Sequence, residues 1–402
     1  MIRIFLGLIL VWQFSWGLLT MEDDYTKEIQ ILKSLDIDIA FLKDPVFLSM
    51  KNNIGIYKTK HFLRVLEDGK TFIPVIRQMI TKAGIPKAFL YLAMAESNFS
   101  AKARSRSRAV GLWQFMPKTA KLLGLKVDRY IDERKDPIKS TKIAIKYLKF
   151  LHKRFGKWYL AAIAYNCGEG KLSRIIKKLG SDDLNLLLDG RKKYLPKESR
   201  MYIRKIVMMA NLSNDEDFIA ENNADHLMNR GSTFALATVD VKGGVSLSSI
   251  GESIHLSAKT LKEYNPQLKY YFTPPYDKKY TIYIPYNKYS LFQKNYKPTK
   301  NNRKFYVYFI KRGDSLYKIG KKFGIPYKVI KDFNHLKSNF LKLGKKLIIP
   351  STGPRFVKYT IKRGDTLSLI SKKFKVKIKK IMQANNMKNS LLKPGEKIVI
   401  PN

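Results

Sequence analysis

The sequence predicts an α+β multidomain protein, with a helical domain in its first half and small βααβ modules in its second half. Two observations lead to this prediction. Apolar residues recur at helical spacing from about Ile29 to Asn222, and beyond Asn222 strand-like alternation appears together with an internal repeat. At 402 residues the chain is long enough for two or three domains with cores of their own.

The helical region has clear start and stop signals. Pro86 is placed to open a helix through PKAFLYLAMAES, and Pro117 to open a second one that stops near Gly124. Asp136-Pro137 is expected to begin a long helix that Gly156 closes, with its apolar stripe at three- and four-residue spacing: Ala144, Ile145, Leu148, Leu151 and Phe155. A further helix is expected from about Lys197 to Leu212.

The second half contains an internal repeat. YFIKRGDSLYKIGKKFGIPYKVIKDFNHL is matched 51 residues later by YTIKRGDTLSLISKKFKVKIKKIMQANNM, and both copies end in a strand and a proline, at Pro350 and Pro401. A weaker copy, offset by 69 residues, closes at Pro285 and lacks the Gly-Asp step. Each copy is interpreted as strand, helix, helix, strand, with Ser315 or Thr366 capping the first helix.

These repeats resemble LysM domains, which are small βααβ modules that bind glycans containing N-acetylglucosamine. The resemblance rests on the Gly-Asp-Ser/Thr-Leu turn, the Ile-x-x-x-Phe step, the late asparagine and the terminal Ile-Pro. It implies a sugar-binding groove between the first turn and the second helix of each module. Three generic small modules remain the alternative interpretation.

The charge balance favours polyanionic partners. Lys and Arg number 77 against 32 Asp and Glu, which gives a formal net charge of +45. Nucleic acid, anionic lipid and acidic cell-wall polymers are the partner classes that such a field attracts. The alternative is a lysine-rich bias that only fills solvated faces. No nucleic-acid motif accompanies the charge, so a nucleic-acid partner is not expected.

The first residues, MIRIFLGLILVWQFSWGLLTMEDD, have the pattern of a signal peptide. Arg3 supplies a positive start, Ile4 to Trp12 a short apolar core, and Ser15-Trp16-Gly17 small residues for cleavage. An uncleaved membrane anchor is the second interpretation, because the charge-free stretch extends to Met21, and a buried core helix is the third. No cysteine lies here, which excludes attachment at a lipoprotein cysteine.

A lone glutamate is the candidate for chemistry in the helical region. Glu96 follows the apolar residues of LAMA near the end of the first expected helix. Burial disfavours the charged form of a carboxyl group and raises its pKa, which is how a glutamate becomes a proton donor near neutral pH. A solvated surface charge is the usual alternative for an isolated glutamate on a helix.

Two downstream motifs favour the catalytic interpretation. GLWQFMP places Gln114 in an apolar turn before a helix, and AIAYNCGEG places Tyr165 and Asn166 at the end of another. Amide and aromatic side chains among apolar residues suit a saccharide groove. A core tyrosine with a satisfied hydroxyl remains the alternative for Tyr165. Cys167, the only cysteine, is interpreted as a buried filler, with neither a zinc site nor a catalytic thiol expected.

Together these segments resemble the lysozyme-like soluble lytic transglycosylases, in particular the membrane-bound D-type murein transglycosylases. The resemblance rests on Glu96-Ser97, Gly111 to Pro117, Ala164-Tyr165-Asn166 and LPKESRMYIRKI, and it covers roughly Pro74 to Leu212. It implies an α-helical lysozyme-like catalytic domain followed by LysM modules. It also implies Glu96 as the catalytic residue and the following substrate-binding residues: Ser105, Trp113, Gln114, Tyr165, Asn166, Glu198 and Tyr202.

The resemblance implies a reaction that needs one carboxyl group. Glu96 would protonate the oxygen that bridges MurNAc and GlcNAc, and would then take the proton from the MurNAc C6 hydroxyl as this closes onto C1. The product is a 1,6-anhydro sugar, formed without water. Tyr165 would orient the Glu96 carboxyl, while Ser105 and Gln114 would hold the acetamido and peptide-stem region of the substrate.

A hydrolytic glycosidase usually needs a second carboxylate. Asp128, Asp132 and Glu133 lie in a charged stretch that we interpret as surface. The alternatives that remain are a goose-type lysozyme-like hydrolase of the same bond and a non-catalytic peptidoglycan-binding envelope protein.

These interpretations give the following expectations for the whole chain. The partners are peptidoglycan glycan strands, and also anionic cell-envelope polymers, with membrane contact only through an N-terminal anchor. No cofactor and no metal are expected, and the location is the periplasm or cell envelope. The expected segments are a signal peptide or anchor (1–20), an N-terminal helical extension (21–73), the transglycosylase domain (74–222), a degenerate LysM-like module (233–288) and two LysM modules (305–350 and 357–401).

Overall fold

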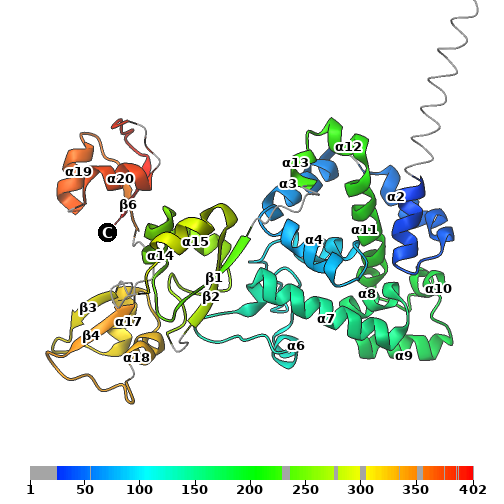
Figure 1. Ribbon diagram of the computed structural model, residues 1–402, viewed down its shortest axis with the longest axis horizontal. Helices are drawn as coiled ribbons and strands as arrows, with labels where there is room; N and C mark the ends of the chain where they lie inside the picture. The colour runs from blue at the N-terminus through cyan, green and yellow to red at the C-terminus, as the bar shows by residue number, and fades with distance from the viewer. Residues whose placement is uncertain are drawn as a thin grey trace, which may run out of the picture. The chain divides into compact units, whose positions relative to one another are not determined.

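The computed structural model describes residues 25–54, 56–228, 236–275, 279–298, 305–334, 336–350, 356–374, 376–385, 387 and 389–401. The expected signal peptide or anchor lies outside these residues. The chain forms two compact units (Figure 1). One runs to Val127 and from Asp132 to Leu236, and the other holds Asp128–Ile131 and continues from Ala237 to the end.

The described part of the first unit is mainly helical. A helix over residues 25–34 comes first. The other helices of this unit are η1 (Ile39–Lys43), α2 (Pro45–Asn52), α3 (Ile56–Gly69), α4 (Ile73–Lys82), α5 (Phe89–Ser97), α6 (Pro117–Leu122), η2 (Glu133–Lys135), α7 (Pro137–Phe155), α8 (Trp158–Cys167), α9 (Glu169–Leu179), α10 (Leu184–Leu188), α11 (Lys197–Asn214), α12 (Glu216–Glu221) and α13 (Asp225–Met228).

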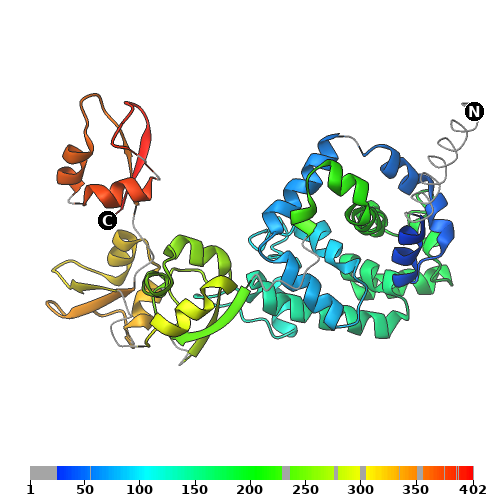
Figure 2. The same cartoon turned by 45° about the horizontal axis from the view of Figure 1, so that its top comes forward.

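Helices α5, α8 and α11 make the centre of this unit. The first two are apolar on nearly all sides, and a helix of that kind is stable only inside a core. All residues of α5 from Phe89 to Met94 are buried, as are all residues of α8 from Tyr159 to Ala164. Both helices pack against α11, which Figure 2 shows foreshortened inside a ring of helices. The ends of these three helices carry the candidate site.

The expected helices are largely confirmed. In α7 the Asp136 carboxylate accepts hydrogen bonds from the backbone amides of Ile138 (3.0 Å) and Lys139 (2.8 Å), and Gly156 ends the helix at φ +78°. The expected start of α5 was early by three residues, because Pro86 to Ala88 form turns before regular helix begins at Phe89.

The expected N-terminal extension packs into the same core as the rest of the helical unit. Leu32, Leu35, Phe41 and Phe47 are buried in one apolar cluster with α5, α8 and α11. Residues before the expected catalytic domain therefore help to build the core that holds the site.

The second unit contains three strand–helix–helix–strand modules. The first module consists of β1 (Leu236–Lys242), α14 (Leu247–Ile254), α15 (Ala258–Tyr264) and β2 (Lys279–Pro285), and is followed by η3 (Tyr286–Lys288) and α16 (Tyr289–Asn295). The second consists of β3 (Phe305–Phe309), α17 (Leu316–Phe323), α18 (Tyr327–Phe333) and β4 (Lys346–Pro350). The third consists of β5 (Phe356–Thr360), α19 (Leu367–Phe374), α20 (Ile378–Ala384) and β6 (Lys397–Pro401). Within each module the two strands pair with each other, and they run antiparallel in the second and third.

A single asparagine joins the second helix of a module to its last strand. The side-chain amide of Asn334 donates to the carbonyls of Ile330 (2.8 Å) and Ile348 (2.6 Å), and its oxygen accepts from the Ile348 amide (2.6 Å). In the first module Asn265 makes the same three kinds of bond, with Leu261 and Tyr283. The weak sequence copy is therefore a full structural copy at this position.

The turn that begins each module's first helix differs between the copies. Ser315 caps α17, and Asp314 accepts hydrogen bonds from the Tyr308 hydroxyl and the Lys311 amide, both at 2.8 Å. The first module keeps a left-handed glycine, Gly244 at φ +75°, and a Ser246 cap. Its missing feature is the aspartate alone: Val245 stands in that place and is fully buried.

Candidate active site

Glu96 lies one residue before the end of α5, where a buried helix emerges from the core. The side chain is half-buried. Burial raises the pKa of its carboxyl group, a hydrogen bond from Tyr202 lowers it, and the nearby charge of Glu198 raises it, so that the pKa is about 7. A carboxyl group with this pKa exists in both protonation states near neutral pH and can give and take a proton.

Tyr202 is the residue that orients Glu96. It lies on α11, is 5% exposed, and donates its hydroxyl to Glu96 Oε1 at 2.6 Å. The expectation from the family resemblance gave this orienting role to Tyr165. In the structure the Tyr165 hydroxyl donates instead to the backbone carbonyl of Trp113 at 2.7 Å.

Ser105 and Gln114 lie on one loop between α5 and α6. The Ser105 oxygen accepts a hydrogen bond from the Ala109 amide at 3.0 Å, and its hydroxyl proton can still be donated. Gln114 has φ +45°, and its side-chain amide nitrogen donates to the Gly111 carbonyl at 2.8 Å. That bond fixes the side chain and presents its oxygen as an acceptor for an N–H group.

Ser97 connects this loop to α5, a role that the motif alone did not predict. Its hydroxyl is buried and lies 2.8 Å from the Leu112 carbonyl and 3.0 Å from the Ala93 carbonyl. Because Ser97 follows Glu96 directly, the same turn of α5 carries the carboxyl group and supports the loop.

Trp113 belongs to the core. Its side chain is fully buried, and its indole N–H donates to the Thr141 hydroxyl on α7 at 2.8 Å. The expected substrate-binding role would require a side chain that the substrate can reach. The contacts of Trp113 instead hold the Gln114 loop against α7 and, through its carbonyl, against Tyr165.

Asn166 and Glu198 lie at the ends of α8 and α11. The Asn166 side-chain oxygen accepts a hydrogen bond from the Ser199 hydroxyl at 2.7 Å, which joins the two helix ends. Glu198 is exposed and is close enough to influence the pKa of Glu96. The structure thus brings Tyr165, Tyr202 and Glu198 near Glu96. Ser105 and Gln114 lie on the loop to which Ser97 and Tyr165 donate hydrogen bonds.

Asp132, Glu133, Arg134 and Asp136 are buried, which corrects the surface interpretation. Asp132, Glu133 and Arg134 are each 6–7% exposed. The charges are tolerated because they are paired: Asp132 with Arg134, and Glu133 with Lys139 at 2.5 Å and the Lys126 amide at 2.8 Å. The run of charged residues DERKD in the sequence gave no sign of this burial.

These pairings decide which carboxylates can take part in chemistry. Asp132 forms an ion pair with Arg134, and Glu133 forms one with Lys139. The Asp128 carboxylate accepts hydrogen bonds from the backbone amides of Tyr130 and Ile131. Glu96 therefore combines burial, a raised pKa and a position beside the loop of Ser105 and Gln114. Glu198 is the other carboxylate that the structure places within electrostatic reach of it.

The residues that the structure describes contain no group of three or more His, Cys, Asp or Glu side chains that could hold a metal ion. No described helix is long and apolar enough to cross a membrane.

Family models match both units. Residues 74–187 match the transglycosylase SLT domain, and residues 235–301 match the LysM-like domain of lytic transglycosylase MltD. The LysM domain matches twice, at residues 308–350 and 359–401.

Similar proteins come from several bacteria. Membrane-bound lytic murein transglycosylase D of Escherichia coli K12 is 26% identical over 392 residues, which cover 90% of this chain and 84% of that protein. N-acetylmuramoyl-L-alanine amidase sle1 of Staphylococcus epidermidis is 35% identical over 24% of this chain and 33% of its own length. A solved structure, the spore cortex-lytic enzyme SleL of Bacillus megaterium, is 37% identical over 25% of this chain and 23% of its own, with a TM-score of 0.15.

A helical unit with a transglycosylase SLT domain, followed by one LysM-like and two LysM domains, has the domain organisation of a cell-wall enzyme. With its SLT domain and LysM modules, the chain is a lytic transglycosylase. More particularly, it is a homologue of membrane-bound lytic murein transglycosylase D.

Proposed function

We propose that the chain cleaves the β-1,4 bond between MurNAc and GlcNAc in peptidoglycan without adding water. The Glu96 carboxyl donates its proton to the bridging oxygen as the bond to C1 breaks. The resulting carboxylate takes the proton of the MurNAc C6 hydroxyl, whose oxygen forms the new bond to C1. The products are a 1,6-anhydroMurNAc end and a free GlcNAc hydroxyl, and Glu96 ends in its starting, protonated state.

The observation that carries this proposal is the Glu96 carboxyl itself. Its pKa of about 7 suits a group that must first donate and then accept a proton. The nucleophile belongs to the substrate, so the enzyme needs to hold the C6 hydroxyl close to C1 rather than supply a second carboxylate.

Four other side chains are proposed to bind the substrate. Ser105 would donate to, and Gln114 accept from, the acetamido and stem-peptide groups of the glycan. Asn166 and Glu198, at the helix ends beside Glu96, would contact the same strand. Tyr165 and Trp113 would act through the loop that they support, since their polar groups bond within the protein.

The three modules are proposed to keep the enzyme on its substrate. LysM domains support peptidoglycan binding, and several linked modules raise the effective concentration of the catalytic domain at a glycan strand. The similarity to lytic murein transglycosylase D points to the cell envelope as the location. The periplasm, with a cleaved leader or a membrane anchor, is the finer proposal.

One observation favours a second candidate, a hydrolase of the same bond. Glu198 is an exposed carboxylate within electrostatic reach of Glu96, and an inverting or retaining hydrolase needs such a second group. Hydrolysis would give a reducing MurNAc end, so the products of the two candidates differ in mass by one water molecule.

Replacement of Glu96 tests the proposal. Glu96→Gln keeps the size of the side chain but removes the acid and the base, so release of muropeptides from sacculi should fall at least ~10²-fold. Sacculus pelleting and circular dichroism serve as controls, because neither should change. Wild-type-like release by the variant would remove Glu96 from the mechanism.

A further inference from the structure

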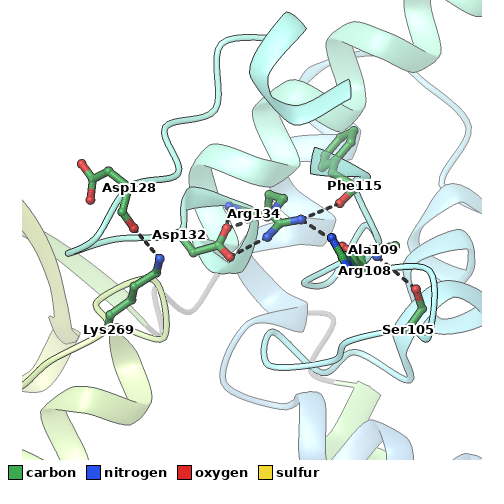
Figure 3. A network of polar contacts seen from close by, with 8 residues as sticks. All are labelled: Ser105, Arg108, Ala109, Phe115, Asp128, Asp132, Arg134 and Lys269. Atoms are coloured by element: carbon green, nitrogen blue, oxygen red, sulfur yellow. Dashed lines mark hydrogen bonds and ion pairs between the residues drawn. The ribbon is translucent and has the colours of Figure 1, made fainter. Parts of the chain in front are cut away.

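The Ser105–Gln114 loop rests on a buried arginine. Arg134 forms a two-pronged ion pair with Asp132, with Nε to Oδ1 at 2.9 Å and Nη2 to Oδ2 at 2.8 Å, and both side chains are 8% exposed. Its remaining nitrogen, Nη1, donates to the backbone carbonyls of Arg108 at 3.1 Å and Phe115 at 3.3 Å. Figure 3 shows the guanidinium between Asp132 on one side and these carbonyls on the other.

The two carbonyls are placed next to the proposed substrate-binding residues. Arg108 ends the turn that Ser105 begins, since the Arg108 amide donates to the Ser105 carbonyl at 3.1 Å. Phe115 directly follows Gln114, and its carbonyl also accepts from the Val110 amide at 3.2 Å. The Arg134 guanidinium therefore bonds to two separate parts of the loop, at Arg108 near Ser105 and at Phe115 next to Gln114.

The backbone of Arg134 supports the loop as well. A Cβ atom on Gly111 would lie 1.8 Å from the Arg134 carbonyl oxygen, and Gly111 has φ +89°, so a side chain is excluded on both grounds. The Gly111 carbonyl in turn accepts both the backbone and the side-chain N–H of Gln114. A displacement of the Arg134 backbone would therefore displace Gly111, and with it Gln114, which is hydrogen-bonded to Gly111.

The support beneath Arg134 is rigid. Asp136 caps α7 two residues later, and Glu133 is held between Lys139 of α7 and the Lys126 amide. A guanidinium has a fixed fork of donors, whereas a lysine ammonium is a single point charge on a flexible stem. Here the guanidinium holds the Asp132 carboxylate and the backbone carbonyls of Arg108 and Phe115 in fixed places.

We infer that Arg134 is a positioning residue for cleavage, which fixes the loop carrying Ser105 and Gln114 at the glycan. The inference rests on the proposed function and adds a residue that does not touch the substrate. An error of about 1 Å in a substrate-holding group can cost ~10²-fold in rate. Arg134→Lys should therefore lower kcat/KM on soluble, uncross-linked glycan strands by about 10- to 100-fold in a folded protein.

A double-mutant cycle with Gln114→Ala separates positioning from general stability. If Arg134 acts through the loop, Arg134→Lys should cost much in the wild-type background and clearly less once Gln114 has lost its side chain, because only the placement of Ser105 can then still be lost. Equal losses in both backgrounds, or full activity of Arg134→Lys alone, would overturn the inference. Such results would leave the proposed function intact, because that depends on the separate loss of activity in Glu96→Gln.

The helical unit offers a matched control. Arg204, 3% exposed, forms a similar two-pronged pair with Asp44 (2.8 and 2.6 Å) and joins α11 to α2, with no bond to the loop. Arg204→Lys loses an equivalent buried fork, and its effect on kcat/KM should be the same with and without Gln114→Ala. Coupling of Arg204 to Gln114 as strong as that of Arg134 would mean that the cycle reports on stability only.

A second variant covers the case in which Arg134→Lys does not fold. Asp132→Asn keeps the volume and one acceptor oxygen but leaves Arg134 without its paired charge. It should lower kcat/KM in the same direction and show the same coupling to Gln114→Ala. Additive behaviour of this variant would overturn the inference in the same way.

Discussion

At the scale of single residues, the site depends on opposed influences on one carboxyl group. Burial raises the pKa of Glu96, the charge of Glu198 adds to the rise, and the Tyr202 hydroxyl lowers it by bonding to the charged form. The result, about 7, is above the ordinary value of 4.5. Since the acid must be protonated to donate, we expect kcat/KM to fall as the pH rises through about 7.

Tyr202→Phe tests the sign of the hydrogen-bond contribution. Loss of a bond to the carboxylate removes a stabilisation of the charged form, so the pKa of Glu96 should rise and the alkaline limb of the pH–rate profile should move to higher pH. The maximal rate should also fall, because the carboxyl loses its orienting partner at 2.6 Å. A limb that moves to lower pH would contradict the assignment.

Glu198→Gln is the opposing variant. It removes a negative charge that raises the pKa of Glu96, so the same limb should move to lower pH. Glu198 is exposed, and salt screens an interaction of that kind over about 8 Å at physiological ionic strength. The shift should therefore shrink as salt is added, whereas the shift from Tyr202→Phe should not.

The sequence predicted the residues of this site better than their partners. Glu96 and Gln114 stand in short motifs whose apolar neighbours indicate burial. The choice between Tyr165 and Tyr202 as the partner of Glu96 depends on how α5, α8 and α11 cross, which no local pattern encodes. Arg134 was missed for a related reason: a run of charged residues usually lies in solvent, and the packing of the loop from Arg108 to Phe115 against it is a tertiary contact.

At the scale of elements, the asparagine that ends the second helix explains why the repeat tolerates so much change. Its three hydrogen bonds hold helix and strand together in the first module as in the second, although Val245 has replaced the aspartate of the turn. The periodic pattern predicted the helices and strands of all three modules. It could not predict this cross-link, because the partners are backbone groups.

Asn334→Ala should loosen the second module without unfolding the helical unit. The change leaves the Ile348 amide and carbonyl without their partner, at a cost of about 1–3 kcal/mol. Hydrogen exchange of β4 amides should accelerate, while exchange in α11 stays the same. Asn389→Ala, which removes an exposed side chain from a loop of the third module, is the matched control and should change neither.

At the scale of the whole molecule, charge and modules make separate contributions to wall binding. The net charge of +45 attracts anionic polymers over a distance that salt shortens, whereas sugar recognition by hydrogen bonds and ring stacking is largely uncharged. The sequence predicted both features, since composition and repeats need no tertiary information.

A chain that ends at Met228 should retain cleavage of soluble glycan strands but pellet poorly with sacculi. The full chain should pellet less at high salt than at low salt and keep a salt-resistant remainder. Equal pelleting of the two chains would show that the modules are not the anchor. Pelleting of the full chain that vanishes at high salt would assign all of the binding to charge.

The most direct test of the central claim is the mass of the muropeptides that the intact enzyme releases from purified sacculi. Cleavage by one carboxyl group with the C6 hydroxyl as nucleophile predicts 1,6-anhydroMurNAc ends, one water molecule lighter than the hydrolysis products and resistant to borohydride reduction. Reducible MurNAc ends of the hydrated mass would contradict the account and would favour the hydrolase, with water as the nucleophile.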